Sequence, residues 1–205
     1  MYFSQLMVAT LFICCLCSCA KLEPSPYASV GSAAPSVNEE QFCNDAQKYC
    51  LAAWYGGNRI ETLVNGGEYF DEMLEAVKSA QRTITFETFV VVNGVVTDEL
   101  VMALCERARA GVKVHFIIDG IGSQRIDERY LMALRCAGVE VEIYRPMNYL
   151  WPWPCNNRDH RKILVVDGKV GFTGGAGYAD CWDGSVEEDW RWRDTMYRIE
   201  GPIVA

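Results

Sequence analysis

The chain has 205 residues, half of them hydrophobic, and a formal net charge of −8. This length fits one domain with a sizeable core and argues against two full-sized ones. The hydrophobic content excludes a disordered chain. The acidic balance disfavours a protein whose main task is to grip nucleic acid, because such proteins usually carry a basic surface.

The first 18 residues are predicted to be a signal peptide. The apolar run over residues 6–17 is too short to cross a bilayer, which takes about 20 residues, but it suits a signal-peptide core. The run ends in "LCSC" at residues 16–19, which resembles the lipobox of bacterial lipoproteins. Cys19 is therefore the predicted lipidation site, and an ordinary signal peptide with incidental cysteines is the alternative. By the sorting rule of that class, Ala20 indicates the outer membrane of a bacterial cell envelope, on the periplasmic side.

A tether is expected between the lipid and the folded domain. Residues 21–40 are rich in Pro, Ser and Ala and show no apolar period, which is typical of a flexible linker. We therefore assign residues 19–42 to a lipidated tether and residues 43–205 to the domain.

Cysteine usage agrees with export. Six of the ten cysteines lie beyond the signal segment: Cys43, Cys50, Cys105, Cys136, Cys155 and Cys181. Six cysteines allow 15 disulfide pairings, and zinc is disfavoured because the six show no C-x-x-C spacing. If Val166 and Lys169 flank a turn at residues 167–168, an extended ladder would place Cys155 opposite Cys181. Free buried thiols are the alternative to that disulfide.

Helical and strand patterns alternate from residue 68 onward. Helices are predicted at 68–80, from a cap at Thr97 to Gly111, and at 128–137. Strands are predicted at 83–92, 112–119, 139–144 and 194–201, with a hairpin at 163–173. Strands alternating with short helices indicate βαβ units, so we expect an α/β fold with a mixed, largely parallel sheet and helices on its faces.

The most informative stretch is "HRKILVVDGKVGFTGG" at residues 160–175. His160 and Lys162 are two positions apart on a predicted strand, so their side chains share a face, and Arg161 points away. An imidazole beside a fixed ammonium suits a reaction at phosphorus. The ring attacks, and the cation neutralises charge on the non-bridging oxygens.

The rest of the stretch carries three further candidates. Asp167 falls at the hairpin turn, where it is expected to orient structure rather than react. Gly174 and Gly175 allow backbone N–H groups to approach an anion closely. The full spacing, H-x-K-x-x-x-x-D followed after six residues by Gly-Gly, is far more specific than a histidine and a lysine alone. It resembles the signature of the phospholipase D superfamily.

The resemblance extends beyond the motif. Blocks such as "GVKVHFIIDGIGS" and "WRDTMYRIEGP", from Asn58 to the C-terminus, are similar to the bacterial cardiolipin synthase branch. The resemblance implies an α/β/α sandwich and phosphodiester exchange through a covalent phosphohistidine, with no metal or other cofactor. It implies that His160 is the nucleophile or its acid/base partner and that Lys162 binds phosphoryl oxygens.

Glu87 in "ETF" and Asp194 in "WRDT" match acidic positions of the family and are predicted supporting groups. The candidate catalytic residues are His160, Lys162 and Asp167; the candidate substrate-binding residues are Glu87, Gly174, Gly175 and Asp194.

Two departures from the family pattern affect these expectations. Gly177 stands where the family usually has an asparagine, and loss of an oxyanion donor commonly costs about 10²–10³ in rate. The chain also has only two histidines, and His115 lies mid-strand, as expected of a core or sheet-face residue. A mechanism with two motifs then needs a second half of a longer protein, which we favour, or a partner chain across a two-fold axis.

Three functions fit these patterns. The first is a phosphatidyltransferase or phospholipase D acting on a phosphatidylglycerol-like lipid. The second is a single-motif nuclease working as a homodimer, which the lone motif favours and the charge does not. The third is a catalytically impaired lipid- or anion-binding lipoprotein, suggested by Gly177.

Overall fold

The computed structural model describes residues 40–51, 53–146, 157–184 and 191–205. The chain divides into two compact units, residues 1–54 and 55–205. In the first unit the described element is helix α2, Glu40–Cys50, which has no buried residue. The sheet domain thus begins at residue 55, whereas we placed its start at residue 43. Among the described residues, no helix combines the length and the apolar character that a membrane span requires.

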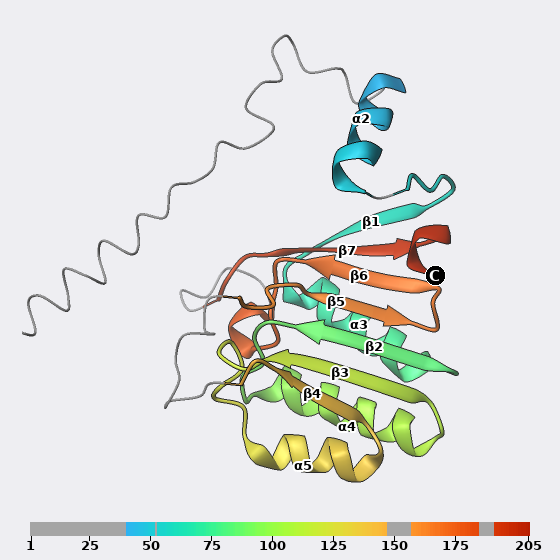
Figure 1. Cartoon of the computed structure of the whole chain (residues 1–205). Coiled ribbons are helices and arrows are strands. Elements are labelled where there is room, and N and C mark those ends of the chain that lie inside the picture. Colours follow the sequence, from blue (N-terminus) through green and yellow to red (C-terminus); the bar gives the residue numbers. More distant parts are fainter. Residues whose placement is uncertain (1–39, 52, 147–156, 185–190) are drawn as a thin grey trace, which may run out of the picture. The chain divides into compact units, whose positions relative to one another are not determined.

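The second unit is built on one seven-stranded sheet. Its order is β1-β7-β6-β5-β2-β3-β4 (Figure 1). The strands are β1 Arg59–Val64, β2 Thr83–Thr88, β3 Lys113–Asp119, β4 Glu140–Tyr144, β5 Ile163–Val166, β6 Val170–Gly174 and β7 Thr195–Glu200. The α/β class and the mixed sheet are confirmed. The expectation of a largely parallel sheet is wrong, because only β2-β3 and β3-β4 pair in parallel, and the other four pairings are antiparallel.

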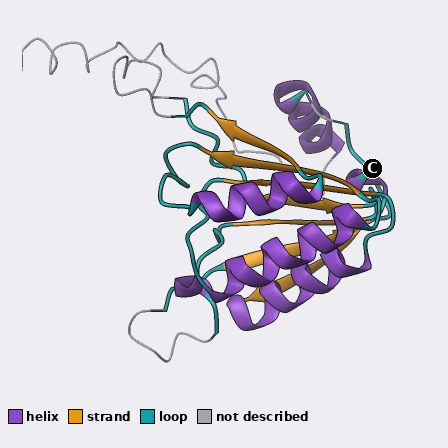
Figure 2. Cartoon of the chain, turned by 90° about the horizontal axis from the view of Figure 1, so that it is seen from below, coloured by secondary structure: helices purple, strands orange, loops and turns teal. Residues whose placement is uncertain are grey.

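Three helices cover one face of the sheet: α3, Gly66–Ser79; α4, Val95–Arg109; and α5, Glu128–Ala137. Figure 2 shows all three on the same side. Alternate strand residues such as Ile84, Phe86, Phe116 and Leu164 are almost fully buried on this side and form the core. On the opposite face, the 3-10 turn η3, Pro202–Val204, lies against β6. Within the described ranges, the predicted sandwich therefore has one helical layer rather than two.

Helix α4 begins two residues before the predicted cap. The backbone N–H groups of Val95 and Val96 donate to the carboxylate of Asp180 at 3.0 and 3.1 Å. Thr97 instead donates its hydroxyl proton to the carbonyl of Val92 at 2.7 Å. The cap was missed because it comes from a segment that is distant in the sequence, the 3-10 turn η2, Asp180–Trp182.

The turn of the β5-β6 hairpin is one residue longer than predicted. Val166 pairs with Val170 rather than with Lys169, because Asp167 has a left-handed φ of 55° and opens a three-residue turn. The last ladder pair is Ile163 with Thr173. The described ladder ends before the two cysteines. Cys155, like the lipidation site Cys19, lies outside the described residues, so the disulfide between Cys155 and Cys181 stays a prediction.

Asp167 ties this turn to the beginning of β2. Its carboxylate accepts hydrogen bonds from the backbone N–H groups of Gln81, Arg82 and Thr83 at 2.7–2.9 Å. Burial raises the pKa of the carboxyl, but these three bonds outweigh it and hold the pKa below its usual range. The carboxylate of Asp167 thus holds the turn against β2, at the end of β5 that is remote from His160.

We predict that Asp167→Asn lowers the free energy of unfolding at pH 7 by about 1.5–3 kcal/mol, the usual contribution of hydrogen bonds to a charged group. Asparagine tolerates the left-handed backbone, so the change isolates the charge. Because the native pKa is depressed, the stabilisation is present above the unfolded-state pKa and is lost as the pH falls through the native one. Urea denaturation at several pH values measures this difference. The exposed neighbour Lys169→Ala serves as the control, and equal effects from both variants would contradict the assignment.

Candidate active site

His160 and Lys162 lie side by side just before β5, on the face that the helices cover. The Lys162 Nζ atom lies 3.1 Å from Nδ1 of the His160 ring and donates to the His160 carbonyl oxygen at 2.8 Å. Lys162 is 7% exposed. Burial lowers the pKa of its ammonium, while the carboxylates of Asp194 and Asp159 act in the opposite direction. The predicted pair is thus formed, with the imidazole at the solvent-accessible edge and the cation beneath it.

Phe89 packs against both members of this pair, and no sequence pattern singles it out. Its ring centroid lies 4.7 Å from that of His160, and the Lys162 Nζ atom lies 5.4 Å from the same centroid. A cation over an aromatic face is attracted by the ring quadrupole. Phe89 directly follows β2, so its contact depends on the β2-β5 pairing, which no local pattern predicts.

A buried carboxylate anchors the segment that carries His160. Asp119, at the end of β3, is fully buried and accepts hydrogen bonds from Nε of Arg158 and from the backbone N–H of Asp159, both at 3.0 Å. Burial raises the pKa of Asp119, but these bonds and those from its own loop hold it below the usual range. Arg158 also donates to the carbonyl oxygen of Tyr144. The backbone before the histidine is therefore fixed to two neighbouring strands.

Asp194 lies on the same side as Lys162, directly before β7. Its carboxylate accepts from the backbone N–H of Thr195 at 2.7 Å and contributes to the electrostatic environment of Lys162. A Cβ atom on Gly175 would stand 2.3 Å from this carboxylate, and one on Gly174 would stand 2.4 Å from the Thr195 carbonyl. The glycine pair thus allows β7 and Asp194 to approach.

The N–H group of Gly175 is not free to bind an anion, in contrast to the role proposed for the pair. It donates to the carbonyl oxygen of Thr195 at 3.3 Å. The structure gives Gly174 and Gly175 a packing role beside β7, and their substrate-binding role stays a prediction.

Glu87 does not join the histidine and lysine. It pairs with Ile163 in the β2-β5 ladder, so its side chain faces the opposite side of the sheet from Lys162. There it forms an ion pair with Arg161 at 2.7 Å, and Arg161 also binds Asp159 at 2.9 Å. Burial and a hydrogen bond to Asp159 raise the pKa of Glu87 to about 7, although Arg161 lowers it. The structure therefore does not bring Glu87 together with His160 and Lys162, and its substrate-binding role stays a prediction.

The second histidine is remote from the first. His115 lies on β3 and forms a 3.1 Å pair with Glu140 on the neighbouring strand, both substantially exposed. This confirms a sheet-face position. Among the described residues, no group of three or more His, Cys, Asp or Glu side chains is placed to hold a metal ion.

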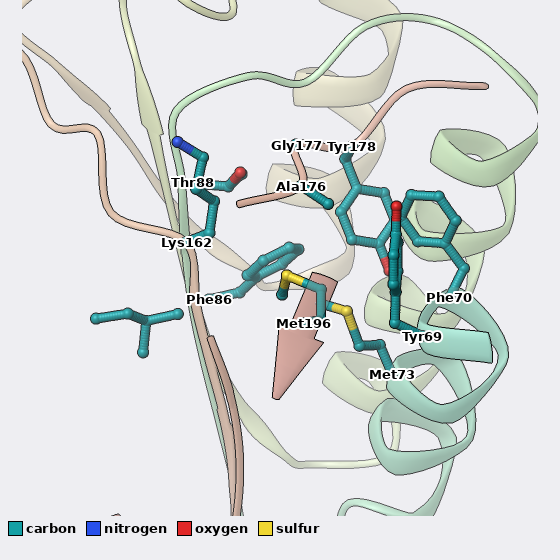
Figure 3. A pocket seen from close by; sticks show the side chains of 11 residues that line it. Tyr69, Phe70, Met73, Phe86, Thr88, Lys162, Ala176, Gly177, Tyr178 and Met196 are labelled. Atoms are coloured by element: carbon teal, nitrogen blue, oxygen red, sulfur yellow. The ribbon is translucent and has the colours of Figure 1, made fainter. Parts of the chain in front are cut away.

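Gly177 lines a small cavity beside Lys162 (Figure 3). A Cβ atom at this position would lie 3.0 Å from the Val90 side chain and 3.1 Å from the ring of Trp182. The Trp182 ring packs edge-on against that of Trp192, with centroids 5.0 Å apart. The glycine thus accommodates an aromatic side chain where the family pattern has an amide.

A mixed α/β sheet that presents a histidine and a buried lysine at the beginning of a central strand defines a phospholipase D-like domain. The sequence profile described as "Cardiolipin synthase, PLD-like domain" matches residues 73–187. The chain belongs to the phospholipase D superfamily, in its cardiolipin synthase-like branch.

Individual relatives agree with this assignment. Cardiolipin synthase A of Pseudomonas fluorescens SBW25 is 35% identical over 76% of this chain and 32% of its own length. Cardiolipin synthase A of Pseudomonas aeruginosa LESB58 is 33% identical over 91% of this chain and 38% of its own. The solved structure of Nuc, a phospholipase D family member from Salmonella typhimurium, is 17% identical with a TM-score of 0.50, covering 71% of this chain and 84% of Nuc. The chain spans about a third of the length of the two cardiolipin synthases.

We predict that Glu87→Gln stabilises the protein increasingly as the pH rises. With a native pKa of about 7, Glu87 holds a proton that the unfolded chain releases near pH 4.5. Its contribution to stability therefore falls between about pH 4.5 and 7 and stays low above that window. Thermal unfolding should show a difference between variant and wild type that is small at pH 5 and reaches at least about 2–4 °C at pH 8, the shift given by 1 kcal/mol at this size. The exposed Glu142→Gln is the matched control, and a difference independent of pH would refute the assignment.

Proposed function

We propose that this protein transfers phosphodiester groups of phospholipids through a covalent phosphohistidine at His160. The observation that carries the proposal is the 3.1 Å approach of the buried Lys162 ammonium to the His160 ring. The fold and the relatives named cardiolipin synthase support phospholipid as the substrate class and phosphatidyl transfer as the reaction. We propose a phosphatidylglycerol-like lipid as the donor, with an alcohol or water as the acceptor.

The chemistry follows from the position of the two side chains. A ring nitrogen of His160 attacks phosphorus, and the bond from phosphorus to the leaving alkoxide breaks. Lys162 stabilises the charge that develops on the non-bridging oxygens. The acceptor then attacks phosphorus and gives its proton to the group that protonated the leaving alkoxide, and the bond from phosphorus to His160 breaks. Each step inverts the phosphorus once, so two steps restore its configuration.

The leaving alkoxide needs a proton, and the other histidine of this chain cannot supply it. His115 lies on β3 and pairs with Glu140, away from the site. We therefore propose that the acid comes from a second copy of the motif, in a further half of the protein or in a partner chain.

Nuclease activity as a homodimer remains the second candidate because the chain carries one motif, while the net charge of −8 disfavours it.

A phosphatidyl ester of p-nitrophenol tests the covalent step in this chain alone, because p-nitrophenolate leaves without a proton. We predict an adduct on His160, detected by mass spectrometry of peptides after an alkaline quench. His160→Ala should abolish it, and His115→Ala, the matched histidine variant, should retain it. Lys162→Met should slow its formation by about 10²-fold or more, as for a lost oxyanion donor.

The outcomes separate the candidate functions. An adduct formed from a nucleotide p-nitrophenyl phosphodiester in preference to the lipid would support the nuclease. No adduct from either ester in the folded wild type would reject covalent catalysis at His160 and favour a binding lipoprotein.

We also propose that the protein is anchored by a lipid on Cys19 in the bacterial cell envelope, at the periplasmic side of the outer membrane. The "LCSC" sequence at residues 16–19 supports this proposal. In bacteria fed an alkyne-tagged fatty acid, the wild type should incorporate the tag and Cys19→Ser should not. Cys17→Ser, which changes the free position of the motif, should still be labelled. Labelling of Cys19→Ser at the wild-type level would contradict this anchor.

A further inference from the structure

Thr88, the last residue of β2, carries a buried hydroxyl group with no partner. The residue is 2% exposed, and within the described part of the chain its Oγ1 atom has no hydrogen bond. Such a hydroxyl loses its hydration on folding and gains nothing in return. Buried polar groups without partners are uncommon, and each calls for an explanation such as a catalytic role or a bound water or ion.

The hydroxyl lies beside the candidate catalytic lysine. Glu87 and Ile163 form the last pair of the β2-β5 ladder, so Thr88 and Lys162 stand one step beyond it, on the side of the helices. Figure 3 shows the two side chains next to one another at one end of the small cavity. The cavity leaves about 10 Å³ for the centre of a water-sized atom, which is room for one oxygen.

The position where the family pattern has an amide offers no side-chain donor in this chain. Gly177 also lines the cavity and has no side chain to offer. The N–H group of Gly175 already donates to the Thr195 carbonyl. The Thr88 hydroxyl is a side-chain donor without a partner next to the Lys162 cation.

We propose that the Thr88 hydroxyl donates a hydrogen bond to a non-bridging oxygen of the bound phosphodiester, beside the Lys162 ammonium. This inference rests on the proposed function and adds to it a binding residue that the motif does not contain. The bound oxygen gives the hydroxyl its missing partner. A neutral donor and a fixed cation then hold the phosphoryl group against the His160 ring.

Thr88→Val tests the proposal because valine has nearly the same shape and lacks the hydroxyl. The melting temperature should stay the same or rise, since an unpartnered hydroxyl is removed from the core. Binding of tungstate, an oxyanion that mimics phosphate, should weaken about 10-fold or more by calorimetry with the 205-residue chain, as expected for a lost hydrogen bond to a charged group. Thr88→Ser should bind within about 3-fold of the wild type because it keeps the donor.

Thr85→Val is the matched control on the same strand. Thr85 is exposed on the opposite face of the sheet, so tungstate affinity should not change. A kinetic readout comes from adduct formation with the p-nitrophenyl lipid. Thr88→Val should slow it in proportion to the lost affinity, and Thr88→Ser should restore it.

The two proposals fail in different ways. If tungstate binding depends on Thr88 but no lipid or nucleotide ester labels His160, the covalent function is rejected and the Thr88 site stands. If His160 is labelled but Thr88→Val binds tungstate as the wild type does, the Thr88 inference is overturned and the function stands. Equal losses in Thr88→Val and Thr88→Ser, or no tungstate binding by the wild type at millimolar concentration, also overturn the Thr88 inference.

Discussion

The antiparallel pairing of β2 with β5 is the contact on which the rest of the site depends. It joins the parallel half of the sheet to the antiparallel half, and its register determines which side chains face the helices. A slip by one residue would move Lys162 to the opposite face. A carboxylate that accepts backbone hydrogen bonds holds each end of β5. Asp167 does so at the turn, and Asp119 on β3 binds the backbone of the residue that precedes His160.

This register also separates the acidic residues of the site by function. Asp194 lies on the helix side with Lys162, where it acts on the ammonium. Glu87 lies on the other side, where it and Asp159 both form ion pairs with Arg161. The same alternation brings Thr88 to the lysine. Within the strand motif "ETF", the Thr88 side chain thus lies on the lysine side and the Glu87 side chain faces away from it.

Much of the fold followed from periodicity. The helix over Glu128–Ala137 was predicted to the residue, because an acidic first turn and a following glycine mark its ends. The order of strand pairing did not follow from periodicity, because a pattern marks a strand without saying which strand it pairs with. In the structure β5, β6 and β7 add to one edge of the βαβ unit. The beginning of α4 was misplaced because its cap, Asp180, arrives from more than 80 residues away.

The sequence by itself determined the chemistry that is available: a histidine and a lysine two positions apart on a strand, a turn aspartate and a glycine pair at a specific spacing. These are local properties, set by the period of a strand and the conformations that turns require. Only the tertiary structure decided which residues surround that pair. Phe89, Asp119 and Thr88 reach the site through pairings between distant strands, and Glu87 is excluded by them, because a sheet face is assigned by register and not by residue type.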